Sequence, residues 1–226
     1  STKSVGLWEA LFTATSAVTV TGLVIEPTHT YWTGFGKSVI LALMFVGGLG
    51  IMTMAAFLLA ILGQKVSTSQ KLMIRETMNT SNIGGIQSLS IAIVGTAVAI
   101  QLVGFILLLI RFVFLYPLDE AIWQSLFHSV SAFNNAGFLS FNSTEGLIEF
   151  QSDFIVISIM TWLIILGSLS FWVVADIFTK KHFRLYSLVS KIVIITTVLL
   201  IALSSILFFF SERSNIETIG NLDLSN

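Results

Sequence analysis

Residues 127–138 read FHSVSAFNNAGF, an apolar, helix-forming stretch followed directly by a polar turn. The surrounding segment, Ala121–Thr144, carries no charge but is rich in serine and asparagine, and only Ile122–Phe133 is apolar enough to enter a membrane. About 12 helical residues reach about 18 Å, roughly half of the hydrocarbon core of a bilayer. Such a half-helix is tolerated at that depth only where protein or water surrounds its turn, so the stretch predicts a re-entrant hairpin.

The same pattern occurs earlier in the chain. Leu7–Val18 is an apolar stretch of the same length, and the turn at 19–22 follows it as the turn at 134–137 follows Ile122–Phe133. One constant shift in numbering superimposes six identical pairs: Trp8 on Trp123, Leu11 on Leu126, Phe12 on Phe127, Ser16 on Ser131, Ala17 on Ala132 and Gly22 on Gly137. The chain therefore contains an internal repeat.

A longer apolar stretch follows each turn, and these stretches match as well. Allowing a longer second loop, Gly47 and Leu49 align with Gly167 and Leu169. Each unit reads half-helix, polar turn, spanning helix. Two units of the same orientation predict an axis along the membrane normal and a shared central path.

The composition is that of a membrane protein. Of 226 residues, 55% are hydrophobic and 10% are charged, whereas soluble domains carry roughly a quarter charged residues. The net charge of −1 gives no reason to expect a nucleic-acid partner, and the lack of cysteine excludes disulfides and thiolate metal sites. Stretches with few or no charges predict spanning helices at Ser38–Leu62, Ile86–Ile110, Phe154–Phe178 and Ser187–Phe210. The predicted fold class is all-α and integral to the membrane, because lipid leaves the backbone no other hydrogen-bond partners.

The basic residues predict the orientation of the chain. The loop at 64–85 carries Lys65, Lys71 and Arg75, and the loop at 179–190 carries Lys180, Lys181 and Arg184. Short loops rich in lysine and arginine stay in the cytoplasm, so both loops are predicted to be cytoplasmic. The two half-helices then enter a multi-pass cell-membrane protein from outside.

The two polar turns predict a cation site. They are Thr19-Val20-Thr21-Gly22 and Asn134-Asn135-Ala136-Gly137. A glycine after a short helix allows successive carbonyl groups to point to one side, and the carboxyl end of each helix carries about half a negative charge. Rings of backbone carbonyls replace the hydration shell of the ion in potassium filters. Either glycine alone could be an ordinary helix cap, and the second copy at the equivalent place favours the ion site.

These stretches resemble the Trk/Ktr/HKT potassium-uptake family, in particular its KtrB-type membrane subunits. LFTATSAVTVTGL at 11–23 is similar to the first pore loop, FHSVSAFNNAGF at 127–138 to the second, and GGLGIMT at 47–53 to the helix after the first. Ile83-Gly84-Gly85 also fits the KtrB branch. The resemblance implies four repeats of helix, pore helix and helix, with re-entrant P-loops around a central ion pathway and one filter glycine from each repeat.

What the resemblance implies for this chain is specific. Gly22 and Gly137 would be two of four filter glycines, and the neighbouring carbonyls would come from Thr19, Val20, Thr21, Asn134, Asn135 and Ala136. The transported ion would be K⁺, with Na⁺ as a candidate coupling ion. The membrane subunit would form a homodimer and carry a cytoplasmic, nucleotide-binding KtrA-like regulatory subunit.

The resemblance also implies how the chain is divided into repeats and loops. Residues 1–63 would be repeat 1 without its leading helix, 64–85 a cytoplasmic loop, and 86–178 repeat 2. Residues 179–226 would hold a second cytoplasmic loop and the first helix of repeat 3 with an outer tail. The chain is therefore expected to be a piece of a larger protein.

Two other functions fit the composition. An alternating-access secondary transporter with a substrate site at broken helices would need charged side chains at mid-membrane depth, and the predicted spans have none. A non-transporting membrane scaffold gives no reason for the repeated turns. An enzyme is not expected, because no constellation of catalytic residues occurs.

Several residues outside the turns are expected to have structural roles. His128 is interpreted as a packed, hydrogen-bonded group. Asp176 is expected to form an interfacial ion pair with Lys180, one helical turn away. The glycines at 47, 48 and 50 are expected to allow close packing against a half-helix rather than to form a hinge.

Overall fold

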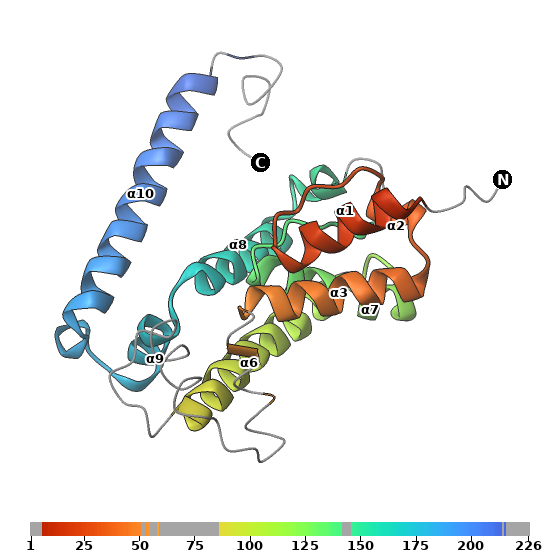
Figure 1. Cartoon of the computed structure of the whole chain (residues 1–226). Coiled ribbons are helices and arrows are strands. Elements are labelled where there is room, and N and C mark those ends of the chain that lie inside the picture. Colours follow the sequence, from red (N-terminus) through yellow and green to blue (C-terminus); the bar gives the residue numbers. More distant parts are fainter. Residues whose placement is uncertain are drawn as a thin grey trace. The chain divides into compact units, whose positions relative to one another are not determined.

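The computed structural model describes residues 6–50, 53–54, 58, 86–141, 146–213 and 215, and every regular element in these ranges is a helix (Figure 1). They belong to two units, Ser1–Ser168 and Leu169–Asn226. The predicted loop at 64–85, with its basic residues and Ile83-Gly84-Gly85, lies outside the described residues. The helices are α1 (Leu7–Val18), α2 (Thr28–Tyr31), α3 (Gly34–Gly48), α6 (Ile86–Phe112), α7 (Leu118–Phe133), η2 (Gly146–Phe150), α8 (Phe154–Ser168), α9 (Phe171–Thr179), η3 (Phe183–Leu185) and α10 (Leu188–Glu212).

Two described helices are long and apolar enough to cross a membrane. They are α6, over Ser90–Phe112, and α10, over Leu188–Glu212. The pair α8 and α9 is a third candidate if the two helices form one interrupted span. By length and composition, the described part of the chain thus has two or three candidate spans where the sequence predicted four.

One predicted span, Ser38–Leu62, is not a continuous helix. It begins earlier than predicted, at Gly34, where Thr33 Oγ1 accepts a hydrogen bond from the Gly36 N–H at 3.2 Å and caps α3. α3 ends at Gly48, because Gly50 adopts a φ of +81°, which a right-handed helix cannot contain. Most of the remaining span lies outside the described residues.

A second predicted span, Phe154–Phe178, is also interrupted. α8 ends at Ser168 and α9 begins at Phe171. The Ser168 hydroxyl donates to the carbonyl of Ile165 at 2.8 Å, a bond to its own turn that competes with the backbone ladder of the helix. When the two sequence repeats are aligned, the break between α8 and α9 lies at the position equivalent to the end of α3.

The half-helices agree closely with the prediction. α1 has the predicted bounds, Leu7–Val18, and α7 ends at the predicted Phe133. α7 begins at Leu118 rather than Ile122, because Pro117 stands at its N-cap and two acidic residues in its first turn suit the positive end of the helix.

Two apolar clusters hold the first unit together. The cluster that matters for the site joins both half-helices to α3, and α1 lies beside α3 in Figure 1. Its buried members are Ala17, Ile40, Met44, Phe127, Val130, Ala136 and Phe138. The second cluster joins α6, α7 and α8 around Phe112, Phe141 and Phe150. Because Ala136 and Phe138 flank the second glycine turn, that turn is anchored in the core.

An ion pair closes the second cluster at one end. Arg111 Nε lies 2.8 Å from Asp153 Oδ2, and Asp153 Oδ1 accepts from the N–H groups of Ile155 and Val156 at the start of α8. Burial acts to raise the pKa of Asp153, but the hydrogen bond from Arg111, these N–H groups and the Arg111 charge together hold it below its usual value.

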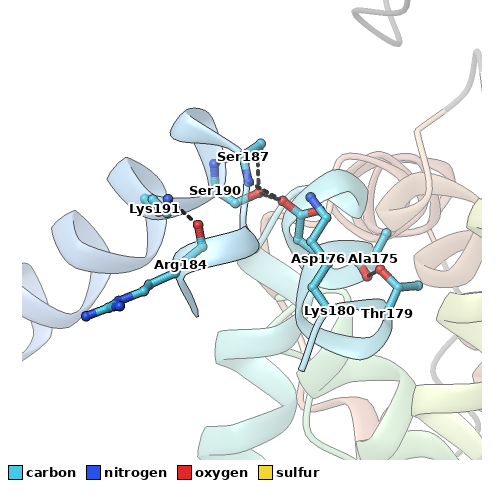
Figure 2. A network of polar contacts seen from close by, with 8 residues as sticks. All are labelled: Ala175, Asp176, Thr179, Lys180, Arg184, Ser187, Ser190 and Lys191. Carbon is cyan, nitrogen blue, oxygen red and sulfur yellow. Dashed lines mark hydrogen bonds and ion pairs between the residues drawn. The ribbon is translucent and has the colours of Figure 1, made fainter. Parts of the chain in front are cut away.

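The second unit contains α9, η3 and α10, which contact one another through a polar network around Asp176 (Figure 2). The predicted ion pair between Asp176 and Lys180 is present at 2.6 Å. Most apolar side chains of α10 are exposed within the described residues, which suits a lipid-facing helix.

Candidate ion-binding site

Both polar turns have the same backbone geometry. After α1, the N–H groups of Val20 and Thr21 donate to the carbonyls of Ala17 and Ser16, at 3.2 and 2.9 Å. After α7, the N–H groups at 135 and 136 donate to the carbonyls at 132 and 131, at 3.1 and 2.9 Å. This pairing is the Schellman motif, which ends a helix by using the backbone donors that follow it. The sequence repeat is therefore a structural repeat down to individual hydrogen bonds.

The turns contain strained backbone at matching positions. Val20 has a φ of +49° and Asn135 a φ of +57°, and these are the only described non-glycine residues with positive φ. Asparagine tolerates this conformation, whereas a β-branched valine there is a true outlier. Such strain costs of the order of 1–3 kcal/mol and collects at functional sites. Gly22 and Gly137, two positions further on, also have positive φ, +77° and +73°.

The two turns meet at their glycines. A Cβ atom on Gly22 would lie 2.5 Å from the carbonyl oxygen of Ala136 and 3.1 Å from the Cα atom of Gly137. A Cβ atom on Gly137 would lie 3.5 Å from the Cα atom of Gly22. The fold thus brings together two glycines that are far apart in the sequence, and at Gly22 the approach leaves no room for a side chain.

The carbonyl oxygens of the turns accept no hydrogen bond from the part of the chain that the structure describes. Among the described residues, no hydrogen bond is accepted by a backbone oxygen of residues 19–22 or 134–137. A cavity of about 320 Å³ lies against Gly22 and Gly137, and Glu26 and His29 are among the residues that line it. The side-chain oxygen Oδ1 of Asn134 is buried and also lacks a donor in the described structure. Of the turn residues, Gly22 and Gly137 are the ones that line this cavity, and acceptors without a donor can bind a cation or water.

Each half-helix ends against a glycine of the following helix. A Cβ atom on Gly47 of α3 would lie 2.0 Å from the carbonyl oxygen of Val18, and a Cβ atom on Gly167 of α8 would lie 1.6 Å from that of Phe133. Gly48 packs on the Asn134 side chain in the same way. The close packing predicted for the first two glycines of the 47–50 stretch is thereby confirmed, whereas a Cβ atom on Gly50 would meet, among the described residues, only Thr53 Oγ1 at 4.0 Å.

One face of α7 holds the segment that follows the second turn. Ser131 Oγ donates to the carbonyl of Phe138 at 2.8 Å, and Gln124 Nε2 donates to the carbonyl of Ser140 at 2.8 Å. His128 Nε2 accepts from the Ser140 N–H at 3.2 Å, so Nδ1 carries the proton and donates to the Gln124 carbonyl at 2.8 Å.

His128 is the centre of this arrangement. It is fully buried, and its ring stacks on Phe141 with centroids 3.7 Å apart. It is therefore packed and hydrogen-bonded, as predicted. The roles of Gln124 and Ser131 were not predicted from the sequence, although their spacing of four and three residues around His128 places all three side chains on one face of a helix.

The first turn is held less firmly. Ser16, the counterpart of Ser131, has a buried hydroxyl without a partner among the described residues. The side chains of Thr19 and Thr21 instead bond to each other, with their Oγ1 atoms 2.7 Å apart. The two turns of the candidate site therefore have the same backbone conformation but differ in the side-chain contacts that support it.

These elements define the class of the protein: an all-helical membrane chain with two matched half-helices and carbonyl-bearing turns. The described residues contain no cluster of three or more histidine or acidic side chains that could hold a metal ion. Backbone oxygens are the ligands that the turns offer.

The chain belongs to the TrkH family, described as cation transport protein, whose match covers residues 1–219. The resemblance drawn from the pore loops is thereby confirmed. That family is one of transport proteins and not of enzymes, which agrees with the prediction.

Individual relatives cover nearly the whole chain. It is 37% identical to Ktr system potassium uptake protein B of Bacillus subtilis over 224 residues, 99% of this chain and 50% of that protein. It is 36% identical to the protein of the same name from Vibrio alginolyticus, over 98% of this chain and 49% of that one. It is also 36% identical to the potassium/sodium uptake protein NtpJ of Enterococcus hirae, over 96% of this chain and 48% of that one. The chain thus spans about half the length of these relatives.

Proposed function

We propose that the chain is part of the ion-conducting subunit of a Trk/Ktr-type potassium uptake system. In this proposal the turns at 19–22 and 134–137 supply half of a carbonyl-lined selectivity filter. One observation supports it above the others. Two turns of identical backbone geometry meet at Gly22 and Gly137, and their carbonyl oxygens accept no hydrogen bond in the described structure.

The geometry suits a partly dehydrated monovalent cation. K⁺ gives up hydration water on entering a filter, and carbonyl oxygens replace that water. The carboxyl ends of α1 and α7 add about half a negative charge each. Strained φ values at Val20 and Asn135, together with the Schellman bonds, keep the carbonyls from turning back into the helices. The site is thus preorganised for an ion.

The rest of the predicted assembly belongs to the same proposal. Residues 1–63 and 86–178 form two of four repeats around a central ion pathway, and 179–226 begin the third. The loops at 64–85 and 179–190 face the cytoplasm of a plasma-membrane protein. A homodimer that carries a KtrA-like regulatory subunit, as the family resemblance implies, is part of the same proposal, and the relatives named as parts of Ktr systems support membership of such a system. Na⁺ is proposed as the coupling ion, and a relative named for uptake of potassium and sodium supports an association with both ions.

The substitution Gly22→Ser in the complete subunit tests the filter. The new Cβ atom would lie 2.5 Å from the Ala136 oxygen on a backbone of positive φ, so the carbonyls must shift and a hydroxyl enters the site. We expect the ratio of K⁺ to Na⁺ uptake to fall by about tenfold, equivalent to about 1.4 kcal/mol. Uptake of each ion is measured in cells that lack other potassium transporters.

Gly34→Ser is the matched control, because no atom of the described residues lies within 4 Å of a Cβ atom at that position. It should leave the ratio unchanged. An unchanged ratio in Gly22→Ser at equal membrane abundance would remove Gly22 from the filter.

A further inference from the structure

The turn between α9 and α10 is held by a network of hydrogen bonds within the second unit (Figure 2). Asp176 Oδ2 accepts from the Ser187 N–H at 2.9 Å and from Ser190 Oγ at 2.7 Å, while Oδ1 pairs with Lys180. Ser187 caps α10 by accepting from the Ser190 N–H at 3.1 Å. The Asp176 carboxylate is therefore fully occupied by the first turn of α10 and by Lys180.

Residues 180–191, here called the basic elbow, keep an excess of positive charge after this pairing. They include Lys180, Lys181, Arg184 and Lys191 and no acidic residue. No ion pair in the described part of the chain uses Lys181 or Arg184, and both residues are exposed. Lys191 Nζ donates to the Arg184 carbonyl at 2.9 Å, which fixes the backbone there, and Figure 2 shows the Arg184 guanidinium pointing away from Asp176.

Exposed apolar side chains stand among these cations. Phe183 is 46% exposed and Leu185 61% exposed, and both belong to η3 at the tip of the elbow. Leu188 and Val189 continue this apolar surface into the first turn of α10. Alternating cations and apolar side chains at the end of a membrane helix are typical of a surface that sits at lipid headgroup level.

We infer that the basic elbow binds the phosphate groups of anionic phospholipids. The cations match a phosphate in charge, and the apolar side chains between them match the acyl region next to it. A soluble protein with a polar, acidic contact surface would pair with the same cations but would offer no apolar contact to Phe183, Leu185 and Leu188. The inference rests on membrane embedding of α10 and not on potassium transport, so it can fail while the proposed function stands.

A local probe tests this inference in the complete subunit. The described chain has no cysteine, so V189C carries a single fluorescent label within the elbow in a subunit that keeps no other cysteine. The phosphatidylcholine vesicles contain one of two probe lipids, phosphatidylglycerol or phosphatidylcholine with the same chains. Each probe lipid bears a nitroxide near its headgroup, which quenches the label when that lipid lies close to it. A label at S211C, at the far end of α10, reports the background.

Each basic residue near an anionic lipid surface contributes about fivefold in binding. We expect Lys181 and Arg184 together to enrich phosphatidylglycerol over phosphatidylcholine at V189C by on the order of 10- to 25-fold. K181Q/R184Q should lower the preference by about this factor. K181R/R184K should keep it, because charge and not shape is recognised, and high salt should weaken it.

The control K37Q/R213Q removes two cations outside the elbow and should change nothing at V189C. An equal signal from both lipids in the parent protein would overturn the inference. So would an undiminished preference in K181Q/R184Q. Loss of a soluble regulatory subunit in K181Q/R184Q, with phosphatidylglycerol binding unchanged, would assign the surface to a protein contact and overturn it as well.

Discussion

The contact between Gly167 and the end of α7 predicts a large effect from adding one methyl group. In Gly167→Ala the new Cβ atom would lie 1.6 Å from the carbonyl oxygen of Phe133 and 2.6 Å from its carbonyl carbon. Both atoms are backbone, so no side chain can rotate away. Phe133 directly precedes the second turn, and any shift of its carbonyl is passed on to residues 134–137.

The size of the shift follows from the distances. Real Cβ atoms essentially never approach another heavy atom closer than 3.0 Å, and ordinary contact begins at 3.4 Å. The two backbones must therefore separate by roughly 1.4 Å to reach the lower limit and by roughly 1.8 Å to reach ordinary contact. Overpacking of this kind costs about 1–3 kcal/mol of stability. A displacement of about an ångström at the carbonyls would also change the fit to K⁺, and a loss of 1.4 kcal/mol there is tenfold in affinity.

The assay compares potassium affinity, the potassium-to-sodium ratio and thermal stability in the complete subunit. Gly167→Ala should lower all three, and Gly47→Ala, whose Cβ atom would lie 2.0 Å from the Val18 oxygen, should behave similarly. In Gly95→Ala the new Cβ atom meets no atom of the described residues within 4 Å, so transport should be unchanged. In Gly104→Ala the nearest atoms belong to the side chain of Leu163, so stability should be affected more than selectivity.

The reasoning would be refuted by Gly167→Ala with normal affinity and selectivity at normal membrane abundance. A Gly95→Ala variant as impaired as Gly167→Ala would also refute it, since the loss would then not depend on the backbone contact, and alanine favours a helix more than glycine does.

Two further predictions concern the acid response and the chain by itself. Because the folded-state pKa of Asp153 is lowered, its ion pair with Arg111 stabilises the fold fully above the ordinary carboxyl pKa and is lost as the pH falls through the lowered value. Asp153→Asn should therefore be less stable than the parent at pH 7 but should lose less stability when the pH falls below about 4. Thermal unfolding of both proteins as a function of pH measures this, and parallel curves of stability against pH would contradict it. Residues 1–226 supply two of the four proposed filter loops, so the chain alone in liposomes should show no selective potassium flux. Selective flux from it would mean that two copies can assemble a filter.

Local features of the site could be predicted from the sequence because they depend on neighbouring residues. The alternation of apolar helix and polar turn predicted α1 with its observed bounds and the end of α7. The repeat predicted that the two turns are equivalent, and the same Schellman bonds follow both half-helices. Turn residues and helix ends are set by short-range sterics and hydrogen bonds, which an isolated stretch already contains.

Other features were decided only by tertiary structure. The meeting of Gly22 with Ala136 and Gly137 joins residues more than a hundred positions apart, and no local pattern encodes that distance. The sequence did not predict the interruption between α8 and α9. A spanning helix is predicted from the length of an apolar stretch, and that length is the same whether or not the helix breaks within it. The hydrogen bond from Ser140 to His128 and the stacking of His128 on Phe141 depend on how the segment after the second turn folds back over α7. Each of these contacts arises from close packing between distant segments, where the fit of backbone to backbone, and not the propensity of any one stretch, selects the structure.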